Sequence, residues 1–253
     1  YFCRYHRLAG ASGTLQGVQG ELWRTYGLPC ITVPTRLPSR LDVAPLRHFA
    51  DAPARRAALL AEVLRLHALR LPVLVGTRRL EDSEALAADL ARAGLAAAVL
   101  NARQTAHEAA VVAAAGQPGR ITVATNMAGR GTDILLTPEV KAAGGLHVIL
   151  TEYHDSARID RQLYGRSGRQ GDPGSYEALV SLEDELFVAH AARLVAWLRA
   201  RTAPDGEVDR RFGPLLRRLA QGAAEAQNAR IRRHTVDSDN RMEQALAFAG
   251  RGE

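Results

Sequence analysis

Two glycine- and arginine-rich turns carry the residues best suited to chemistry in this sequence. The first reads Gly-Arg-Gly-Thr-Asp over residues 129–133, and the second reads Gly-Arg-Ser-Gly-Arg-Gln-Gly-Asp over residues 165–172. A guanidinium group offers paired planar donors that match phosphoryl oxygens, and glycines let a backbone turn tightly beside a ligand. These residue types indicate a site for a phosphate-bearing ligand.

Arg166 and Arg169 of the second turn are the candidate catalytic residues. If residues 158–164 are helical, Gln162 and Arg166 lie four positions apart on one face, and Arg169 follows three residues later. An arginine placed against a γ-phosphate typically accelerates phosphoryl transfer by about 10³–10⁵. The alternative is a pair of solvated surface arginines, which the three surrounding glycines make a poor explanation.

The first turn is a weaker signal on its own. Gly129 and Gly131 flank Arg130 and allow the backbone to approach a ligand. Asp133 is placed to hold a ribose hydroxyl or to pair with an arginine of the second turn. The alternative is a structural turn with a surface salt bridge.

A third turn of small residues occupies positions 10–14, near the start of the sequence. Its Ser12 and Thr14 flank Gly13 and can relay hydrogen bonds between a nucleotide site and the segment that follows. Alone, such a turn fits any loop.

A sheet is needed to position these turns, and from residue 72 onward short β-rich runs alternate with helical stretches. We expect strands at 72–77, 97–100, 121–125, 145–151 and 176–182, and helices at 53–70, 81–93, 105–115 and 156–163. This alternation predicts a parallel sheet with right-handed crossovers. Ligand sites then gather at the carboxyl ends of the strands, where Thr77 and Met127 lie.

The two ends of the sequence differ from this pattern. Prolines at positions 29, 34, 38 and 45 predict an extended crossing segment. Residues 215–249 are rich in Arg, Ala, Gln and Glu without β-rich runs, which predicts one or two long helices.

The composition bears on the size of the core, the charge of possible partners, metal binding and membrane spans. The 253 residues are 47% hydrophobic, enough to bury a full core, and the net charge of +6 permits nucleic acid, anionic lipid or phosphate partners without choosing among them. The two cysteines form no Cys-x-x-Cys pair and the histidines show no ligand spacing, so we expect no metal site. No apolar stretch approaches the ~20 residues that span a bilayer.

Two further motifs are missing from the sequence. It contains neither the Gly-x-x-x-x-Gly-Lys-Ser/Thr phosphate loop nor an Asp-Glu metal box after a strand. We therefore expect this chain to supply only one wall of a nucleotide site, together with its arginine fingers. The sequence starts at Tyr1, with motifs following at once, and is expected to be a fragment of a longer protein.

The motifs together resemble those of the SecA preprotein translocase ATPase family. Residues 122–134, 144–149 and 158–174 carry the likeness, which extends to 181–184. Residues 72–77 and 100–102 also fit, and residues 10–14 resemble the family's Gly-Met-Thr-Gly-Thr with Ala11 and Ser12 substituted. The likeness is strong from 72 to 184 and weak after 190.

The resemblance implies the α/β fold of a second RecA-like lobe of helicase superfamily 2, with a parallel sheet flanked by helices and a C-terminal helical segment. ATP with Mg²⁺ would lie between this lobe and a first lobe carrying the phosphate loop and the Mg²⁺ ligands. The implied divisions are 1–35, the end of the first lobe and a crossing segment; 36–205, the second lobe; and 206–253, a scaffold-like helical segment.

The resemblance also implies roles for single residues. Arg166 and Arg169 match arginine-finger positions, and Asp133 matches an aspartate that contacts nucleotide. The residues expected at the cofactor are Gly129, Arg130, Gly131, Asp133 and Gln162, and the residues expected to couple hydrolysis to movement are Gly13, Thr14 and Thr77.

The implied function is that of a motor lobe in an ATP-driven protein translocase. Its expected partners are its own first lobe, a SecYEG-type membrane channel and an unfolded preprotein, and its expected place is the cytoplasm or the inner face of the plasma membrane. A nucleic-acid helicase lobe is one alternative, although the sequence lacks basic segments interleaved with aromatics for base stacking. A nucleotide-binding regulatory relative without turnover is the other.

Overall fold

The computed structural model describes residues 5–100, 105–125 and 132–249. Within them, seven strands form a sheet with the order β1-β7-β6-β3-β5-β4, while β2 pairs with a later part of β7, and every strand pairing is parallel. The strands are β1 (Arg40–Val43), β2 (Arg47–Phe49), β3 (Val73–Thr77), β4 (Ala97–Leu100), β5 (Ile121–Thr125), β6 (Leu146–Leu150) and β7 (Pro173–Ser181).

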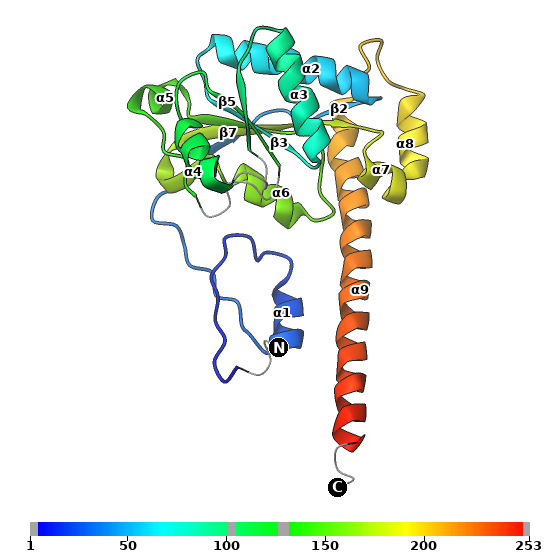
Figure 1. The fold of residues 1–253 in the computed structure, drawn as a ribbon. Helices are drawn as coiled ribbons and strands as arrows, with labels where there is room; N and C mark the ends of the chain where they lie inside the picture. Colours follow the sequence, from blue (N-terminus) through cyan, green and yellow to red (C-terminus); the bar gives the residue numbers. More distant parts are fainter. Residues whose placement is uncertain (1–4, 101–104, 126–131, 250–253) are drawn as a thin grey trace.

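Helices cover both faces of this sheet (Figure 1). The helices α2 (Ala52–Ala68) and α3 (Leu80–Arg92) lie over one face, and α4 (Thr105–Ala114) and α6 (Ala157–Tyr164) lie over the other. Because both faces are covered, all five residues of β3 are buried, and so are all five of β6. The expected fold class, a parallel α/β sheet flanked by helices with a helical C-terminal segment, is confirmed.

The side chains of β3 show how one strand serves two cores. Val73 and Val75 pack among the residues of α2 and α3, whereas Leu74 packs on the opposite face with Leu163 of α6. Gly76 is needed on that second face, because a Cβ at this position would collide with the Leu163 side chain. The glycine therefore lets α6 lie close against the sheet.

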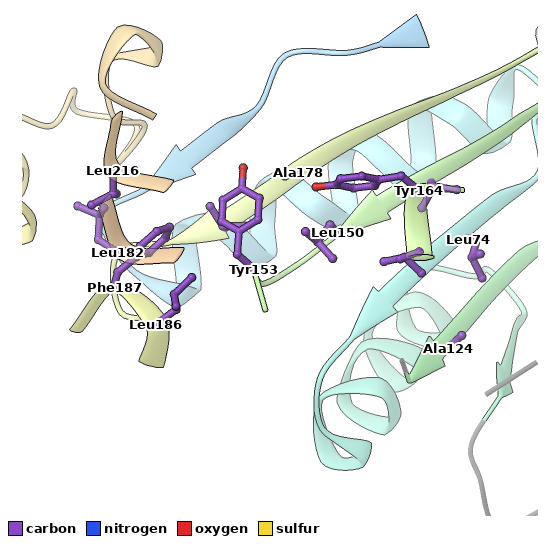
Figure 2. Close-up of a cluster of buried hydrophobic side chains, with 14 of the residues drawn as sticks. Leu74, Ala124, Leu150, Tyr153, Tyr164, Ala178, Leu182, Leu186, Phe187 and Leu216 are labelled. Carbon is purple, nitrogen blue, oxygen red and sulfur yellow. The ribbon is translucent and has the colours of Figure 1, made fainter. Parts of the chain in front are cut away.

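The C-terminal part of the chain is built on the carboxyl end of β7. The helices α7 (Glu185–His190) and α8 (Ala192–Arg199) lead through η3 (Arg210–Phe212) to α9 (Gly213–Ala249), a single helix that projects far beyond the sheet (Figure 1). Figure 2 shows Leu182, Leu186 and Phe187 gathered around Leu216 of α9. This apolar contact fixes the first turns of α9 on the lobe.

The remaining elements are short. The helix α1 (Gln19–Tyr26) belongs to the N-terminal segment, which lies beside the body of the sheet, below α6 in Figure 1, and α5 (Pro138–Ala143) precedes β6. Thr137 caps α5 by accepting a hydrogen bond from the Val140 amide, with Pro138 at the first helical position.

Gly145 is required by the close approach of β6 to the start of β7. Its φ is +85°, and a Cβ there would collide with the carbonyl oxygen of Pro173, whereas the neighbouring Gly144 has a φ of +120° and open space around it. We expect Gly145→Ala to lower the free energy of unfolding by about 1–3 kcal/mol more than Gly144→Ala, since both variants strain the backbone but only the first overpacks it. Urea denaturation of the two variants measures this difference, and equal destabilisation would contradict the packing argument.

Candidate functional site

A cleft with a volume of about 590 Å³ lies where the N-terminal segment meets α6 and the end of β5. It is the place in the described chain where the second and third turns of the sequence come together. Its lining residues are Ser12, Gly13, Thr14, Leu41, Ala124, Thr125, Ile159, Arg161, Gln162, Leu163, Tyr164, Gly165, Arg166, Arg169 and Tyr176.

The second turn follows α6 and is held by left-handed backbone conformations. Gly168, Gln170 and Gly171 have φ values of +66°, +54° and +81°, and residues Arg169–Gly171 form the short 3-10 helix η2. A Cβ at Gly168 would lie 2.9 Å from the Leu41 Cβ, so glycine is needed there for space as well as conformation. The turn thus bends back and presents its arginines toward the cleft.

Residues 158–164 are helical as expected, but the helix does not reach Arg166. The helix α6 ends at Tyr164, with Gly165 as its C-cap, so Arg166 stands in the turn and not on the helix. The turn nonetheless brings Arg166 into the same cleft as Gln162. Arg166 is half-buried, and its backbone amide donates to the Leu163 carbonyl at 3.0 Å.

Arg169 connects the second turn to the first. Its Nη1 donates to Asp133 Oδ1 at 2.9 Å, its Nε donates to the Gly165 carbonyl at 2.6 Å, and Gln170 donates to Asp133 Oδ2 at 3.3 Å. Of the two roles expected for Asp133, the pairing with an arginine of the second turn is the one seen in the structure. Both partners are more than a third exposed, so the pair adds little to stability and serves mainly to orient Arg169.

Gln162 connects α6 to the third turn. Its Nε2 donates to Thr14 Oγ1 at 3.4 Å, and Ser12 Oγ lies 3.3 Å from the same hydroxyl. The neighbouring Arg161 donates from Nη2 to the Gln16 carbonyl at 3.0 Å. These hydrogen bonds join Ser12 and Thr14 to the helix that leads into Arg166.

Arg161 is a cleft residue that the sequence analysis did not select. Its Nε is buried and has no hydrogen-bond partner among the described residues. A buried donor without a partner costs about 1–3 kcal/mol, and an anionic ligand in the cleft would satisfy it. The sequence offered only its position next to Gln162 as a reason to select Arg161. An arginine on a helix also fits a solvent-exposed face, so that position did not single it out.

Thr77 does not line the cleft, and the Gly-Arg-Gly turn is not among the described residues. Thr77 ends β3, is buried, and donates from Oγ1 to the Arg79 carbonyl at 3.4 Å. Its register partner on β5, Thr125, lines the cleft, so Thr77 lies one strand away from it. Gly129, Arg130 and Gly131 lie outside the described residues, as does Met127.

The wall of the cleft beneath the arginines is aromatic. The rings of Tyr164 and Tyr176 stack with centroids 3.9 Å apart. Burial raises the pKa of the Tyr164 phenol, so this ring stays neutral.

Among the described residues that line the cleft, none is Asp or Glu, so the cleft offers cations, an amide and hydroxyls to a ligand. That set fits phosphate oxygens and does not fit a Mg²⁺ ion.

Comparisons with known proteins agree on one family. The model of the family described as "SecA P-loop domain" matches residues 47–142 and 137–205. The chain is 48% identical over 253 residues to "Protein translocase subunit SecA 2" of Nitrosospira multiformis and 46% identical over 254 residues to the protein of the same name from Bordetella avium. It is 47% identical over 246 residues to "Protein translocase subunit SecA" of Porphyromonas gingivalis.

The chain corresponds to only part of these relatives. All of it aligns with the first two, but it spans 38% of the length of each, and 96% of it aligns with 22% of the Porphyromonas protein.

Among solved structures, the DEAD-box protein SrmB from E. coli is 22% identical with a TM-score of 0.46, covering 64% of this chain and 87% of that one. The yeast DEAD-box splicing factor Prp28 is 17% identical with a TM-score of 0.47, covering 74% and 40%. Likenesses at this level say nothing about function.

None of the described helices combines the length and apolar character needed to cross a bilayer. The family match extends over well more than half of the chain, and it includes the sheet, α6 and the arginine-rich turn. The chain belongs to the SecA family.

Proposed function

We propose that this chain is the second nucleotide-binding lobe of an ATP-driven protein translocase and that its cleft forms one wall of the ATP site. The observation that carries the proposal is the meeting of Arg166, Arg169 and Gln162 in one cleft beside Thr14. Family membership supports the same reading, because the relatives are named as protein translocase subunits.

The two arginines would act on the γ-phosphate. Their guanidinium donors stabilise the charge that develops on phosphoryl oxygens as the bond to the leaving group breaks. Arg169 is already oriented by Asp133 and Gly165, so little reorganisation is needed when the ligand binds. Bound ATP with Mg²⁺ would supply the phosphoryl group that is transferred to water.

The other half of the ATP site would come from a first lobe. The sequence holds no phosphate loop, and the described lining residues include no carboxylate to hold Mg²⁺. We assign both, and the acidic group that activates water, to that first lobe. Residues 1–35 then belong with the first lobe, residues 36–205 form the second, and 206–253 begin a scaffold.

Lobe movement would pass through the contacts of the N-terminal segment. Gln162 and Arg161 hold residues 14–16 from α6, and Arg232 of α9 donates to both carboxylate oxygens of Glu21 at 2.6 and 2.9 Å. A movement of the arginine turn would therefore be passed to both the first lobe and α9.

We place the protein in the cytoplasm or on the inner face of the plasma membrane, with a SecYEG-type channel and unfolded preproteins as partners.

A two-piece assay tests whether the site is shared. We expect this chain alone to hydrolyse no ATP, the full-length protein to hydrolyse it, and a mixture of this chain with the separately produced preceding portion to regain turnover. Turnover by this chain alone would contradict a shared site. Equal recovery with an Arg166→Ala version of this chain would contradict the assigned role of the arginine.

A further inference from the structure

Three side chains with metal-ligand chemistry lie between α2 and the sheet, on the face opposite the cleft. They are Glu62 of α2, His147 of β6 and Glu177 of β7, and one ligand atom from each lies within 4.8 Å of the other two. In the part of the chain that the structure describes, these are the three histidine, cysteine or acidic side chains whose ligand atoms lie close enough together to hold a metal ion. The three positions are far apart in the sequence, so no spacing motif reveals them.

The strand register sets two of the three side chains on one face. His147 is paired with Ser175 and Ile149 with Glu177, so His147 and Glu177 occupy successive positions on the same face of neighbouring strands, the face that α2 covers. His147 Nε2 lies 3.1 Å from Glu177 Oε1. Two ligands of a tetrahedral zinc ion, each bound at about 2.0–2.2 Å, lie roughly 3.3 Å apart. The two atoms are thus already at the spacing of ligands that share an ion.

The histidine ring is also held in the orientation that a ligand needs. Its Nδ1 lies 2.7 Å from Ser175 Oγ, which leaves Nε2 directed toward the carboxylate. Histidine ligands in metal sites are commonly held in this way through their second ring nitrogen, and losing that support typically weakens metal binding about 10- to 100-fold.

Glu177 is a buried carboxylate that lies beside His147. Its side chain is only 6% exposed, and its hydrogen-bond partner among the described residues is His147. A buried carboxylate needs an opposite charge or strong donors. Arg47 and Arg65 lie near enough to interact electrostatically with Glu177, and a bound cation would add a charge that the carboxylate coordinates directly.

The two nearby arginines are hydrogen-bonded to Glu62 and Glu207. Arg65 donates to both oxygens of Glu62 and holds the pKa of that carboxyl below its usual range. Arg47 donates from Nε and Nη2 to Glu207 at 3.0 and 2.6 Å. Neither arginine is hydrogen-bonded to Glu177 within the described residues, and Glu62 would bind an ion by giving up a hydrogen bond with Arg65.

We propose that Glu62, His147 and Glu177 bind a divalent transition-metal ion of the zinc class. One imidazole with two carboxylates suits zinc better than magnesium, which prefers oxygen ligands alone. The Glu62 side chain is 16% exposed and lies on the open side of the group, so an ion enters there and keeps a water as its fourth ligand. The bound ion clamps α2 to β6 and β7 and is separate from the nucleotide cleft.

Titration of this chain with ZnCl₂, followed by calorimetry and by the thermal unfolding midpoint, tests the site. We expect one ion per chain and a raised midpoint, because a ligand that binds only the folded state stabilises it. Co²⁺ bound by the imidazole and the carboxylates should show visible absorption bands of the coordinated ion. These bands should disappear when excess Zn²⁺ displaces the Co²⁺.

Variants decide whether these residues are the ligands. Glu177→Gln and His147→Asn should weaken Zn²⁺ binding at least about tenfold. Glu62→Gln, at the open side where folding is least affected, should do the same while unfolding normally without metal. The exposed residues Glu185→Gln and His234→Asn serve as controls and should bind like the wild type. Absence of stoichiometric Zn²⁺ binding, or unchanged affinity in Glu62→Gln and Glu177→Gln, would overturn the proposal.

Discussion

Replacing Arg166 with alanine in the full-length protein should lower ATP turnover by about 10³- to 10⁵-fold while leaving nucleotide affinity largely unchanged. The half-buried Arg166 lines the cleft beside Gln162 and Arg169. In the proposed role, its charge would act on the γ-phosphate most strongly when negative charge builds up in the transition state. Most ground-state binding would come from the phosphate loop of the other lobe. Steady-state turnover and a fluorescent-nucleotide titration separate the two effects.

A matched arginine provides the control. Arg120 is exposed and immediately precedes β5, at the end of the sheet opposite the cleft. Arg120→Ala should keep normal turnover. Arg166→Lys should recover little, because an ammonium group lacks the planar paired donors of a guanidinium. Loss of nucleotide binding by a normally folded Arg166→Ala protein would contradict the assignment of Arg166 as a finger.

Replacing Asp160 with alanine should lower the free energy of unfolding by about 3–5 kcal/mol, because partners of a buried charge are left unsatisfied. Asp160 is fully buried in α6 and accepts from His154 N at 3.0 Å, His154 Nδ1 at 2.7 Å, Gln221 Nε2 at 2.7 Å and Arg217 Nη2 at 3.4 Å. The last two donors come from α9. This carboxylate therefore fastens the helix that leads into the arginine turn to the long C-terminal helix.

The neighbouring Asp155 is the matched control for Asp160. It is about half exposed and lies 3.7 Å from Arg78, so Asp155→Ala should cost less than about 1 kcal/mol. Urea denaturation of this chain compares the two variants, and limited proteolysis tests whether α9 is released. If Asp160→Ala unfolds at the same urea concentration as Asp155→Ala, the buried group does not hold α9 in place.

The central strands of the sheet could be predicted because each is a short apolar run buried on both faces. The strand β1, Arg40–Val43, could not, since it is mostly exposed and depends on its pairing with β7. The same pairing explains why β7 begins at Pro173, three residues before the expected strand. Within residues 215–249, the absence of proline allowed one or two helices, and the structure has one continuous helix whose first turns pack against α7.

The candidate site was predictable where the chemistry is local. The arginine turn follows from residue types within a short stretch, whereas its pairing with Asp133, 36 positions earlier, was one of two roles that the residue types suggested. The attachment of α6 to α9 through Asp160 and Gln221 depends on residues about sixty positions apart, which no local pattern reports. Thr77 ends a strand as expected, but its distance from the cleft is set by strand order.

Stimulated ATPase activity of the full-length protein tests the central claim most directly. Turnover would be measured alone, with vesicles that contain a SecYEG-type channel together with an unfolded preprotein, and with single-stranded RNA. A translocase motor should be stimulated by the channel with preprotein and left unchanged by RNA. Stimulation by RNA, with no response to channel and preprotein, would contradict the account and identify a helicase lobe instead.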